Sequence, residues 1–224
     1  MTVLISTCCI KKKMLNQICN LYKKNNIFDI ELSAGKYFKN LNSFLNKKKK
    51  IFNFQVHNYF PVPEKPFVFN LASENKIIIN KSLKHAKRAI KIASNLERKI
   101  YSFHAGYLVD PSTNELGKDM KKRQVYSKDK SMKRFISNVK KLAKFAKKYN
   151  VKLLIENNVI TKKEFDNFQK NTVLMADPNE INYIFSKMPN NVRMLLDVAH
   201  FKVSSKGLKF NLVKSLKKIN KWIE

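Results

Sequence analysis

The sequence predicts an α/β fold of the (β/α)8 barrel type, with about six βα units in a single domain over residues 1–224. Short β-branched or aromatic runs recur along the chain, and each is followed by a longer segment with helical periodicity. This alternation is typical of parallel βα units. The length of 224 residues and the apolar fraction of 44% are enough for one well-buried domain.

The predicted elements follow this alternation in chain order. The strands are expected at 2–6, 28–32, 51–56, 99–103, 152–155 and 193–196. Helices are expected at 13–24, 76–96, 131–149, 178–187 and 210–223. The clearest helix is 131–149, whose apolar stripe of Phe135, Val139, Leu142, Phe145 and Ala146 lies between faces of lysine.

Two connections, 58–75 and 105–130, are longer than a turn between strand and helix requires. Structureless segments of this length are usually functional or disordered. Because each follows a predicted strand that ends in histidine, we interpret both as functional.

Six βα units do not close an eight-stranded barrel, which typically needs about 250 residues. The sequence therefore predicts one of two states. Either the chain is a C-terminally incomplete copy without the seventh and eighth units, or it is an open variant that another chain completes. Exposed strand edges and apolar helix faces favour association, so a homo-oligomer is expected in the second case.

The net charge of +30 is the feature that would favour nucleic acid as a partner. Only five of the 46 basic residues are arginine, whereas recognition of phosphates and bases relies heavily on the bidentate guanidinium. The lysines are spread over the whole sequence together with asparagine and isoleucine. We therefore interpret the charge as a biased, solvated surface rather than one basic face.

Cysteine use and the N-terminal sequence indicate a cytoplasmic protein without a membrane partner. Cys8, Cys9 and Cys19 have no CxxC spacing, and we expect them to be reduced, packed thiols. The opening residues MTVLISTCCI are apolar, but the lysines follow them, which is the wrong order for a signal peptide. No apolar run approaches the roughly 20 residues that span a bilayer.

The ends of the predicted strands carry the chemistry, because catalytic groups in (β/α) barrels lie there and on the loops that follow. Imidazole or carboxylate groups stand at five of these ends: Glu31 in DIELSAG, His57 in FQVHNYF, His104 in YSFHAG, Glu156 in LLIENN, and Asp197 and His200 in MLLDVAH. The fourth histidine, His85, lies inside a predicted helix and is interpreted as structural.

Imidazole and carboxylate groups that converge on one face are the ligand set of Zn²⁺, Mn²⁺, Fe²⁺ or Co²⁺. Glu156 and Asp197 each end an apolar run, where a lone carboxylate is costly without a cation or hydrogen-bond donors. Lysines or backbone amides could hold these carboxylates instead, and any single histidine could be an ordinary core imidazole. We predict a divalent metal site built from His57, His104, Glu156, Asp197 and His200.

At these residues the sequence resembles the xylose isomerase-like TIM barrel superfamily, over essentially the whole chain. The superfamily contains sugar isomerases and epimerases and also the endonuclease IV family. In the endonuclease branch, histidines end the third and fourth strands, a Glu ends the fifth and an Asp-x-x-His follows the sixth, which His57, His104, Glu156, Asp197 and His200 match. The stretches VHNYF and FNLAS are similar to that branch as well.

In the epimerase branch, the Glu of the fifth strand and the Asp of the sixth bind one divalent metal, and the following His contacts substrate oxygen. Glu156, Asp197 and His200 match these roles. Both branches take further ligands from the seventh and eighth strands, a His and a Glu at least, which this sequence does not contain. DIELSAG looks more like the epimerases.

The resemblance implies a metal-dependent isomerase or epimerase of a sugar or sugar phosphate, using Mn, Zn or Co. Glu156 and His200 would be catalytic, and the residues expected to contact substrate are His57, His104 and Glu31. One alternative is an endonuclease IV-like, zinc-dependent phosphodiesterase on abasic DNA, in which His57 and His104 hold further ions. Another is a non-catalytic barrel remnant that acts as a binding subunit.

Overall fold

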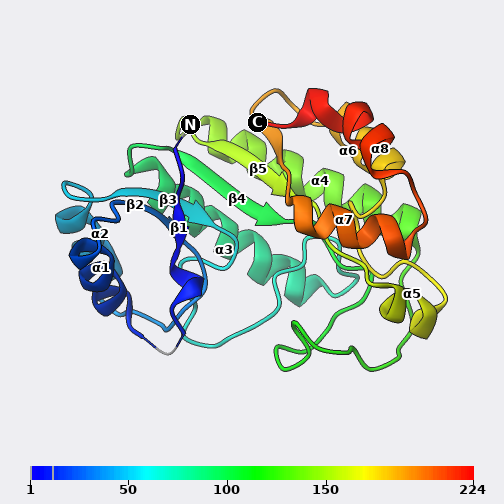
Figure 1. Ribbon diagram of the computed structural model, residues 1–224, viewed down its shortest axis with the longest axis horizontal. Helices are drawn as coiled ribbons and strands as arrows, with labels where there is room; N and C mark the ends of the chain where they lie inside the picture. Colours follow the sequence, from blue (N-terminus) through cyan, green and yellow to red (C-terminus); the bar gives the residue numbers. More distant parts are fainter. Residues whose placement is uncertain (1, 12) are drawn as a thin grey trace.

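The centre of the molecule is a six-stranded parallel sheet with the strand order β1-β2-β3-β4-β5-β6 (Figure 1). The computed structural model describes residues 2–11 and 13–224. The strands are β1 (Ile5–Ser6), β2 (Asp29–Leu32), β3 (Asn53–His57), β4 (Ile100–His104), β5 (Lys152–Glu156) and β6 (Val192–Leu195). All five ladders are parallel, so the carboxyl ends of the strands meet at one edge of the sheet. This confirms the predicted α/β class and the number of strands.

The helices lie between the strands in the chain. They are α1 (Leu15–Lys24), α2 (Leu41–Lys48), α3 (Lys76–Ser94), α4 (Lys128–Lys147), α5 (Lys162–Phe168), α6 (Pro178–Ser186), α7 (Val198–Gly207) and α8 (Leu212–Ile219). Two short 3-10 turns, η1 (Thr7–Cys9) and η2 (Asn220–Trp222), complete the helical segments of the described residues. The sequence patterns predicted α1, α3, α4, α6 and α8 but missed α2, α5 and α7.

Two strand predictions were too long, and the final helix is shorter than predicted. The strand predicted at 2–6 contains only β1, because Ile5 and Ser6 alone pair with β2 at this edge of the sheet. Residues 49–51 form a turn, and Phe52 separates it from β3. The helix predicted at 210–223 ends at Ile219, and Ile223 then forms a parallel bridge to Met194 of β6.

The hydrophobic core lies between the sheet and helices α3 and α4. Tyr101 and Phe103 of β4 are fully buried. The predicted stripe of α4 faces this core, since Phe135, Val139 and Leu142 are also fully buried. The helix begins earlier than predicted because the Ser127 hydroxyl accepts the backbone N–H of Lys130 at 3.5 Å.

The two long connections occur as predicted, within the part of the chain that the structure describes. Residues 58–75 and 105–127 contain neither a helix nor a strand. Asp110 joins them, because its carboxylate accepts hydrogen bonds from Asn70 Nδ2 at 2.9 Å, Ser73 Oγ at 2.6 Å and Tyr126 OH at 2.6 Å. The loops after β3 and β4 are therefore fixed against each other beside the carboxyl edge of the sheet.

The cysteine prediction is right only for Cys19. This thiol is buried, and burial raises its pKa to about 11. Cys8 and Cys9 are free and exposed, because η1 follows a two-residue edge strand that has a neighbour on one side only. The prediction that they are packed is wrong.

Among residues 2–11 and 13–224, no helix combines the length and the apolar character needed to cross a membrane.

Candidate metal centre

Glu156, the last residue of β5, lies at the centre of the predicted site. Its side chain is only 8% exposed. Oε2 lies 3.4 Å from Nε2 of His57, and Oε1 lies 3.7 Å from Nδ1 of His104 and 3.6 Å from Nδ1 of His200. The sheet register explains this convergence, since His104 pairs with Glu156 and His57 pairs with Ser102. The ends of β4 and β5 are therefore level, and β3 ends two residues earlier in the register, beside Ser102.

Asp197 caps the N-terminus of α7 and holds His200 beside Glu156. Its Oδ1 accepts the backbone N–H of His200 at 2.8 Å, and its Oδ2 lies 3.5 Å from His200 Nδ1. Asn157 fixes this turn from β5, because its Oδ1 accepts the N–H of Asp197 at 2.8 Å and its Nδ2 donates to the Asp197 carbonyl at 3.0 Å. The motif Asp-x-x-His is thus one helical turn held by a buried amide.

The protonated nitrogen of His200 follows from its backbone partner. Nδ1 lies 3.0 Å from the carbonyl oxygen of Asn157. A carbonyl oxygen can only accept, so Nδ1 carries the hydrogen and Nε2 is the free nitrogen.

His57 connects Glu156 to Glu31 on β2. Its Nδ1 lies 2.9 Å from Ser102 Oγ and 3.9 Å from Glu31 Oε2. The three site imidazoles are neighbours, since the ring centres of His57 and His104 are 5.6 Å apart and those of His104 and His200 are 5.7 Å apart. All six predicted site residues therefore meet at the carboxyl edge of the sheet.

Burial dominates the electrostatics of the cluster. Burial, with the carboxylates of Asp197 and Glu31 nearby, raises the pKa of Glu156 from 4.5 to about 8. Burial and the adjacent imidazoles of His57 and His200 lower the pKa of His104 from 6.5 to about 3. Burial also lowers the pKa of His57, and the negative charges of Glu31 and Asp197 oppose this effect. His57 and His104 are therefore neutral at pH 7, and ionised Glu156 needs a nearby cation.

The donor set fits a divalent cation. Two groups of three side chains bring one ligand atom each within 4.8 Å of one another, namely His57, His104 and Glu156, and Glu156, Asp197 and His200. Nδ1 of His104 is buried, has no hydrogen-bond partner and faces Glu156. Neutral imidazole and carboxylate oxygen suit Zn²⁺, Mn²⁺ or Co²⁺. Because Glu156 belongs to both groups, the cluster fits one ion or two.

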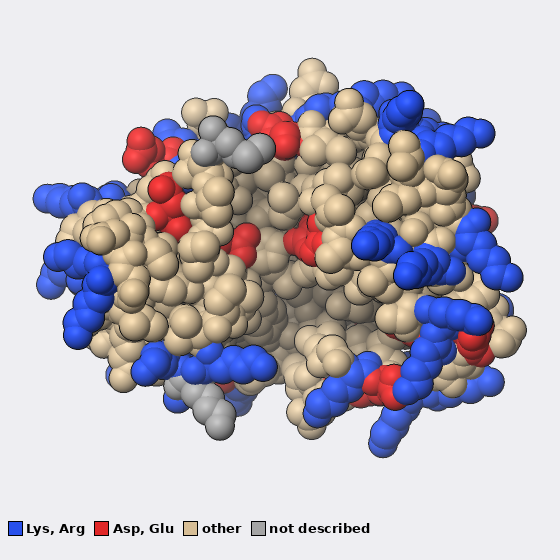
Figure 2. Space-filling view, viewed as in Figure 1, with Lys and Arg blue, Asp and Glu red and all other residues tan. Residues whose placement is uncertain are grey.

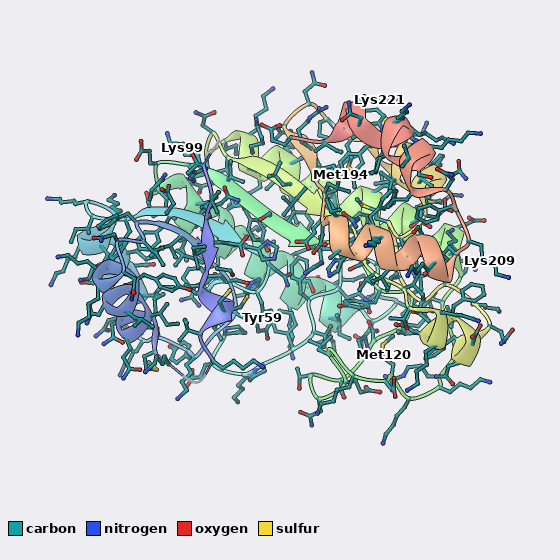
Figure 3. All side chains as sticks on the ribbon, viewed as in Figure 1. Tyr59, Lys99, Met120, Met194, Lys209 and Lys221 are labelled. Carbon is teal, nitrogen blue, oxygen red and sulfur yellow. The ribbon has the colours of Figure 1, made fainter. Side chains whose placement is uncertain are left out.

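A cavity of about 890 Å³ opens beside the cluster. His104 and His200 line it near the cluster, and the loop after β4 and helix α5 line it further away. Figure 3 shows Met120 on this loop near α5, where Asn167 Nδ2 donates to the Met120 carbonyl at 3.4 Å. The loop and α5 thus form a common wall.

Charge is distributed unevenly around this opening. Figure 2 shows Lys and Arg around the periphery of this face, whereas acidic side chains border the hollow at its centre. The arrowheads of β4 and β5 point to the same centre in Figure 1. The basic residues do not gather over the cluster, which agrees with the interpretation of the charge as a dispersed surface.

His85 lies apart from the cluster, as the sequence predicted. It belongs to α3, is buried and stacks on Tyr59 with ring centres 5.5 Å apart. Its Nε2 lies 3.4 Å from the Asn58 carbonyl.

Two residues of the centre were missed by the sequence analysis. Asn157 had a signal, because ENN directly after the apolar run LLI places an uncharged polar side chain at a strand end. Ser102 had none, because it is a single hydroxyl inside a strand.

The sequence model of the family described as xylose isomerase-like TIM barrel matches residues 26–221. The chain belongs to this family. No sequence among the curated proteins matches the chain significantly.

Solved structures with the same fold include proteins of different activities. A D-tagatose 3-epimerase-like protein is 16% identical over 98% of this chain and 71% of its own, with a TM-score of 0.68. The D-psicose 3-epimerase of Clostridium cellulolyticum H10 is 14% identical over 95% of this chain and 66% of its own, with a TM-score of 0.63. The probable 3-DHS dehydratase AsbF of Bacillus anthracis is 13% identical over 100% of this chain and 71% of its own, with a TM-score of 0.62.

At these identities the likeness concerns the fold alone. The chain spans 66% to 71% of the length of these three structures.

Proposed function

We propose that the chain is a divalent-metal-dependent isomerase or epimerase of a sugar or sugar phosphate. The observation that carries the proposal is the position of Glu156, a buried carboxylate among neutral imidazoles and a second carboxylate, beside a cavity. Two of the similar structures are named as sugar 3-epimerases or epimerase-like, and one of them was solved with D-tagatose. Because a probable dehydratase has the same fold, the fold does not identify the reaction, and the proposal rests on the residues of the site.

Proton transfer next to a carbonyl is the reaction that this arrangement supports. Ionised Glu156 takes the proton from the carbon alpha to the carbonyl, the electron pair of the C–H bond forms the double bond of an enediolate, and the carbonyl oxygen gains the negative charge. For isomerisation the proton returns to the former carbonyl carbon, and the hydroxyl proton of the first carbon moves to the former carbonyl oxygen, so that the first carbon becomes the new carbonyl. For epimerisation it returns to the opposite face of the same carbon, which needs a second group on that face. Glu156 and Asp197 would hold the divalent cation, which would supply Lewis-acid stabilisation of the enediolate.

The other site residues bind and orient the sugar in this proposal. His200 donates from Nδ1 to the Asn157 carbonyl, so its free Nε2 can accept a hydrogen bond from a substrate hydroxyl. His57 and His104 hold a second ion or contact the sugar, and Glu31, whose Oε2 lies 3.9 Å from His57 Nδ1, contacts the sugar from the side of β2.

Substitution of Glu156 by Gln tests the proposed base. Wild-type chain loaded with Mn²⁺, Zn²⁺ or Co²⁺ should exchange solvent deuterium into at least one member of a panel of ketopentoses, ketohexoses and their phosphates. Glu156→Gln should slow this exchange about 10²- to 10⁴-fold, the usual contribution of a general base. The matched control is Glu164→Gln, since Glu164 is another partly buried carboxylate, on the wall of the cavity formed by α5, and it accepts a hydrogen bond from Thr172 outside the cluster.

The control should exchange at nearly the wild-type rate. Exchange at the wild-type rate in Glu156→Gln would exclude its role as base. A wild-type chain that exchanges no member of the panel would refute the isomerase proposal itself.

A second candidate function is a metal-dependent phosphodiesterase acting on abasic DNA. The observation that favours it is the presence of a second group of possible ligands, formed by His57, His104 and Glu156. Glu156 also belongs to the first group, with Asp197 and His200. Clustered ions activate water and neutralise phosphate charge. The net charge of +30 is compatible with a DNA partner.

Counting bound ions and assaying incision separate the two candidates. Two or more zinc ions per chain, together with incision of a duplex that contains one abasic site, would favour the phosphodiesterase. A single bound ion and no incision would favour the sugar enzyme.

A further inference from the structure

Ser102 is a fully buried hydroxyl in β4 that the proposed chemistry does not use. Its Oγ lies 2.9 Å from Nδ1 of His57 and 3.4 Å from the carbonyl oxygen of Val56. The Ser102 hydroxyl therefore lies between the imidazole of His57 and the carbonyl oxygen of Val56, on the side of the His57 ring opposite Glu156.

A hydroxyl accepts and donates at the same time, whereas a carbonyl only accepts. If the hydrogen of Ser102 is donated to the Val56 carbonyl, the Ser102 oxygen is left to accept a hydrogen from His57 Nδ1. Glu31 acts in the same direction, because its Oε2 is the carboxylate oxygen near Nδ1, at 3.9 Å. Both neighbours of Nδ1 thus stabilise a hydrogen on this nitrogen.

The opposite nitrogen of His57 then has a free lone pair. Nε2 lies 3.4 Å from Glu156 Oε2, inside the group formed by His57, His104 and Glu156. We infer that Ser102 is a positioning residue that fixes the Nδ1–H tautomer of His57 and so makes Nε2 the ligand atom for a divalent cation. Partners of this kind, on the far nitrogen of a ligating histidine, orient the ring and set its tautomer.

The inference rests on the cation site of the proposed function, and two measurements separate it from that proposal. The first is the affinity of the full chain for Zn²⁺, measured by titration calorimetry after chelation. Ser102→Ala should bind Zn²⁺ about 10- to 100-fold more weakly than wild type, the usual effect of losing such a partner.

The matched control is Ser82→Ala. Ser82 is also fully buried, and its Oγ accepts the backbone N–H of Asn70 at 3.0 Å, away from the cluster. The control should keep the wild-type affinity, so that the loss of a buried hydroxyl is not itself the cause. Equal affinities for Ser102→Ala and Ser82→Ala would overturn the inference.

The second measurement reads the tautomer without metal. In the metal-free wild-type chain with ¹⁵N-labelled histidine, long-range proton–nitrogen spectra should show a protonated Nδ1 and an unprotonated Nε2 for His57, assigned with a His57→Gln sample. A hydrogen on Nε2 would overturn the inference, even if Ser102→Ala does not fold. A wild-type chain with the expected tautomer that binds no Zn²⁺ would refute the proposed cation site and leave the tautomer assignment standing.

Discussion

Removing the charge of Glu156 should stabilise the metal-free protein at alkaline pH. The folded chain holds a proton on Glu156 up to a pKa of about 8, whereas the same carboxyl in the unfolded chain ionises near 4.5. Between these values the folded state binds more protons than the unfolded state, so stability falls as pH rises through this window. Below pH 4.5 the carboxyl is protonated in both states and contributes nothing.

The upper limit of the effect follows from the two pKa values. At about 1.4 kcal/mol for each pKa unit, the gap between 4.5 and about 8 corresponds to at most about 5 kcal/mol once the pH exceeds 8. Glu156→Gln has the shape of the protonated acid and no charge. It should therefore unfold like wild type near pH 4.5 and at higher urea than wild type near pH 9.

Urea unfolding at these two pH values in the presence of EDTA measures the difference directly. A variant with the wild-type midpoint at pH 9 would refute the reasoning, because Glu156 would then be ionised in the folded state without cost. Adding Zn²⁺ or Mn²⁺ at pH 8 should reduce the stability advantage of the variant, because the variant lacks the shared ligand. An ion present at 100 times its dissociation constant adds about 2.7 kcal/mol to the wild type, and one at about 10⁴ times this constant adds about 5.5 kcal/mol, which exceeds the upper limit and reverses the order.

Three further changes test other parts of the centre. Asn157→Ala removes both hydrogen bonds to the backbone of Asp197 and should lower the free energy of unfolding, measured in urea, by about 2–4 kcal/mol. It should also weaken metal binding. Unchanged metal affinity would contradict the role of Asn157 in holding Asp197. Gly106→Ala would place a methyl group 2.4 Å from the side chain of Ala72 and should lower the free energy of unfolding by about 1–3 kcal/mol. Gly117→Ala, at a φ of +74 in open space, should lower it by only about 1 kcal/mol. Equal losses of stability in the two variants would contradict the tight contact at Gly106. The wild type should lose stability as the pH falls from 6.5 to about 3, because in this range only the unfolded chain binds a proton on His104. His104→Asn should lose less stability over the same range. The same pH dependence of the thermal unfolding temperature in wild type and variant would contradict the effect of burial on the pKa of His104.

The elements that the sequence predicted have a buried face made of large apolar residues. Helix α4 is the clearest case, because Phe135, Val139 and Leu142 mark its inner face at helical spacing. Helix α7 is the opposite case, since Phe201 is the one large apolar residue buried on it, beside Ser204 and Gly207, while Val198 is 57% exposed. A single buried apolar residue makes no stripe, so periodicity could not detect this helix.

Helix α5 had a signal of another kind. Only Phe168 is buried on it, so it has no apolar stripe. Its start is encoded locally, because Thr161 accepts the backbone N–H of Glu164 at 3.0 Å, and Thr-x-x-Glu is the pattern of a capping box. Capping residues would therefore have predicted this helix where hydrophobic periodicity could not.

The candidate site was predictable to the extent that strand ends were predictable. A parallel sheet brings all its carboxyl ends to one edge, so His57, His104 and Glu156 had to meet once their strands were identified. Which nitrogen of each imidazole faces Glu156 depends on ring orientation and on partners such as Ser102 and Asn157. These partners are ordinary polar residues in the sequence, and only the three-dimensional contacts give them a role.

The hydrogen bonds around the three imidazoles also bear on which chemistry the centre performs. Nδ1 of His104 has no partner, and Nε2 of His57 faces Glu156, so neither imidazole has to give up a hydrogen bond to become a ligand there. His200 differs, because the nitrogen near Glu156 is the one that lies 3.0 Å from the Asn157 carbonyl. To bind an ion through Nδ1, His200 must lose this bond, whereas as a substrate contact it keeps it.

The order in which ions bind is therefore more informative than their number. A first equivalent of Zn²⁺ that shifts the ¹⁵N signals of both His57 and His104 would occupy the group with no competing bonds and would leave Asp197 and His200 for a second ion, as clustered-metal phosphodiester chemistry requires. A first equivalent that leaves both imidazoles unchanged would lie on Glu156 and Asp197. His57 and His104 would then remain free to contact a sugar, and His200 would keep its bond to Asn157 while accepting a substrate hydroxyl. In either case Glu156 belongs to the first ion, so the imidazole signals, and not the carboxylate, distinguish the sugar enzyme from the phosphodiesterase.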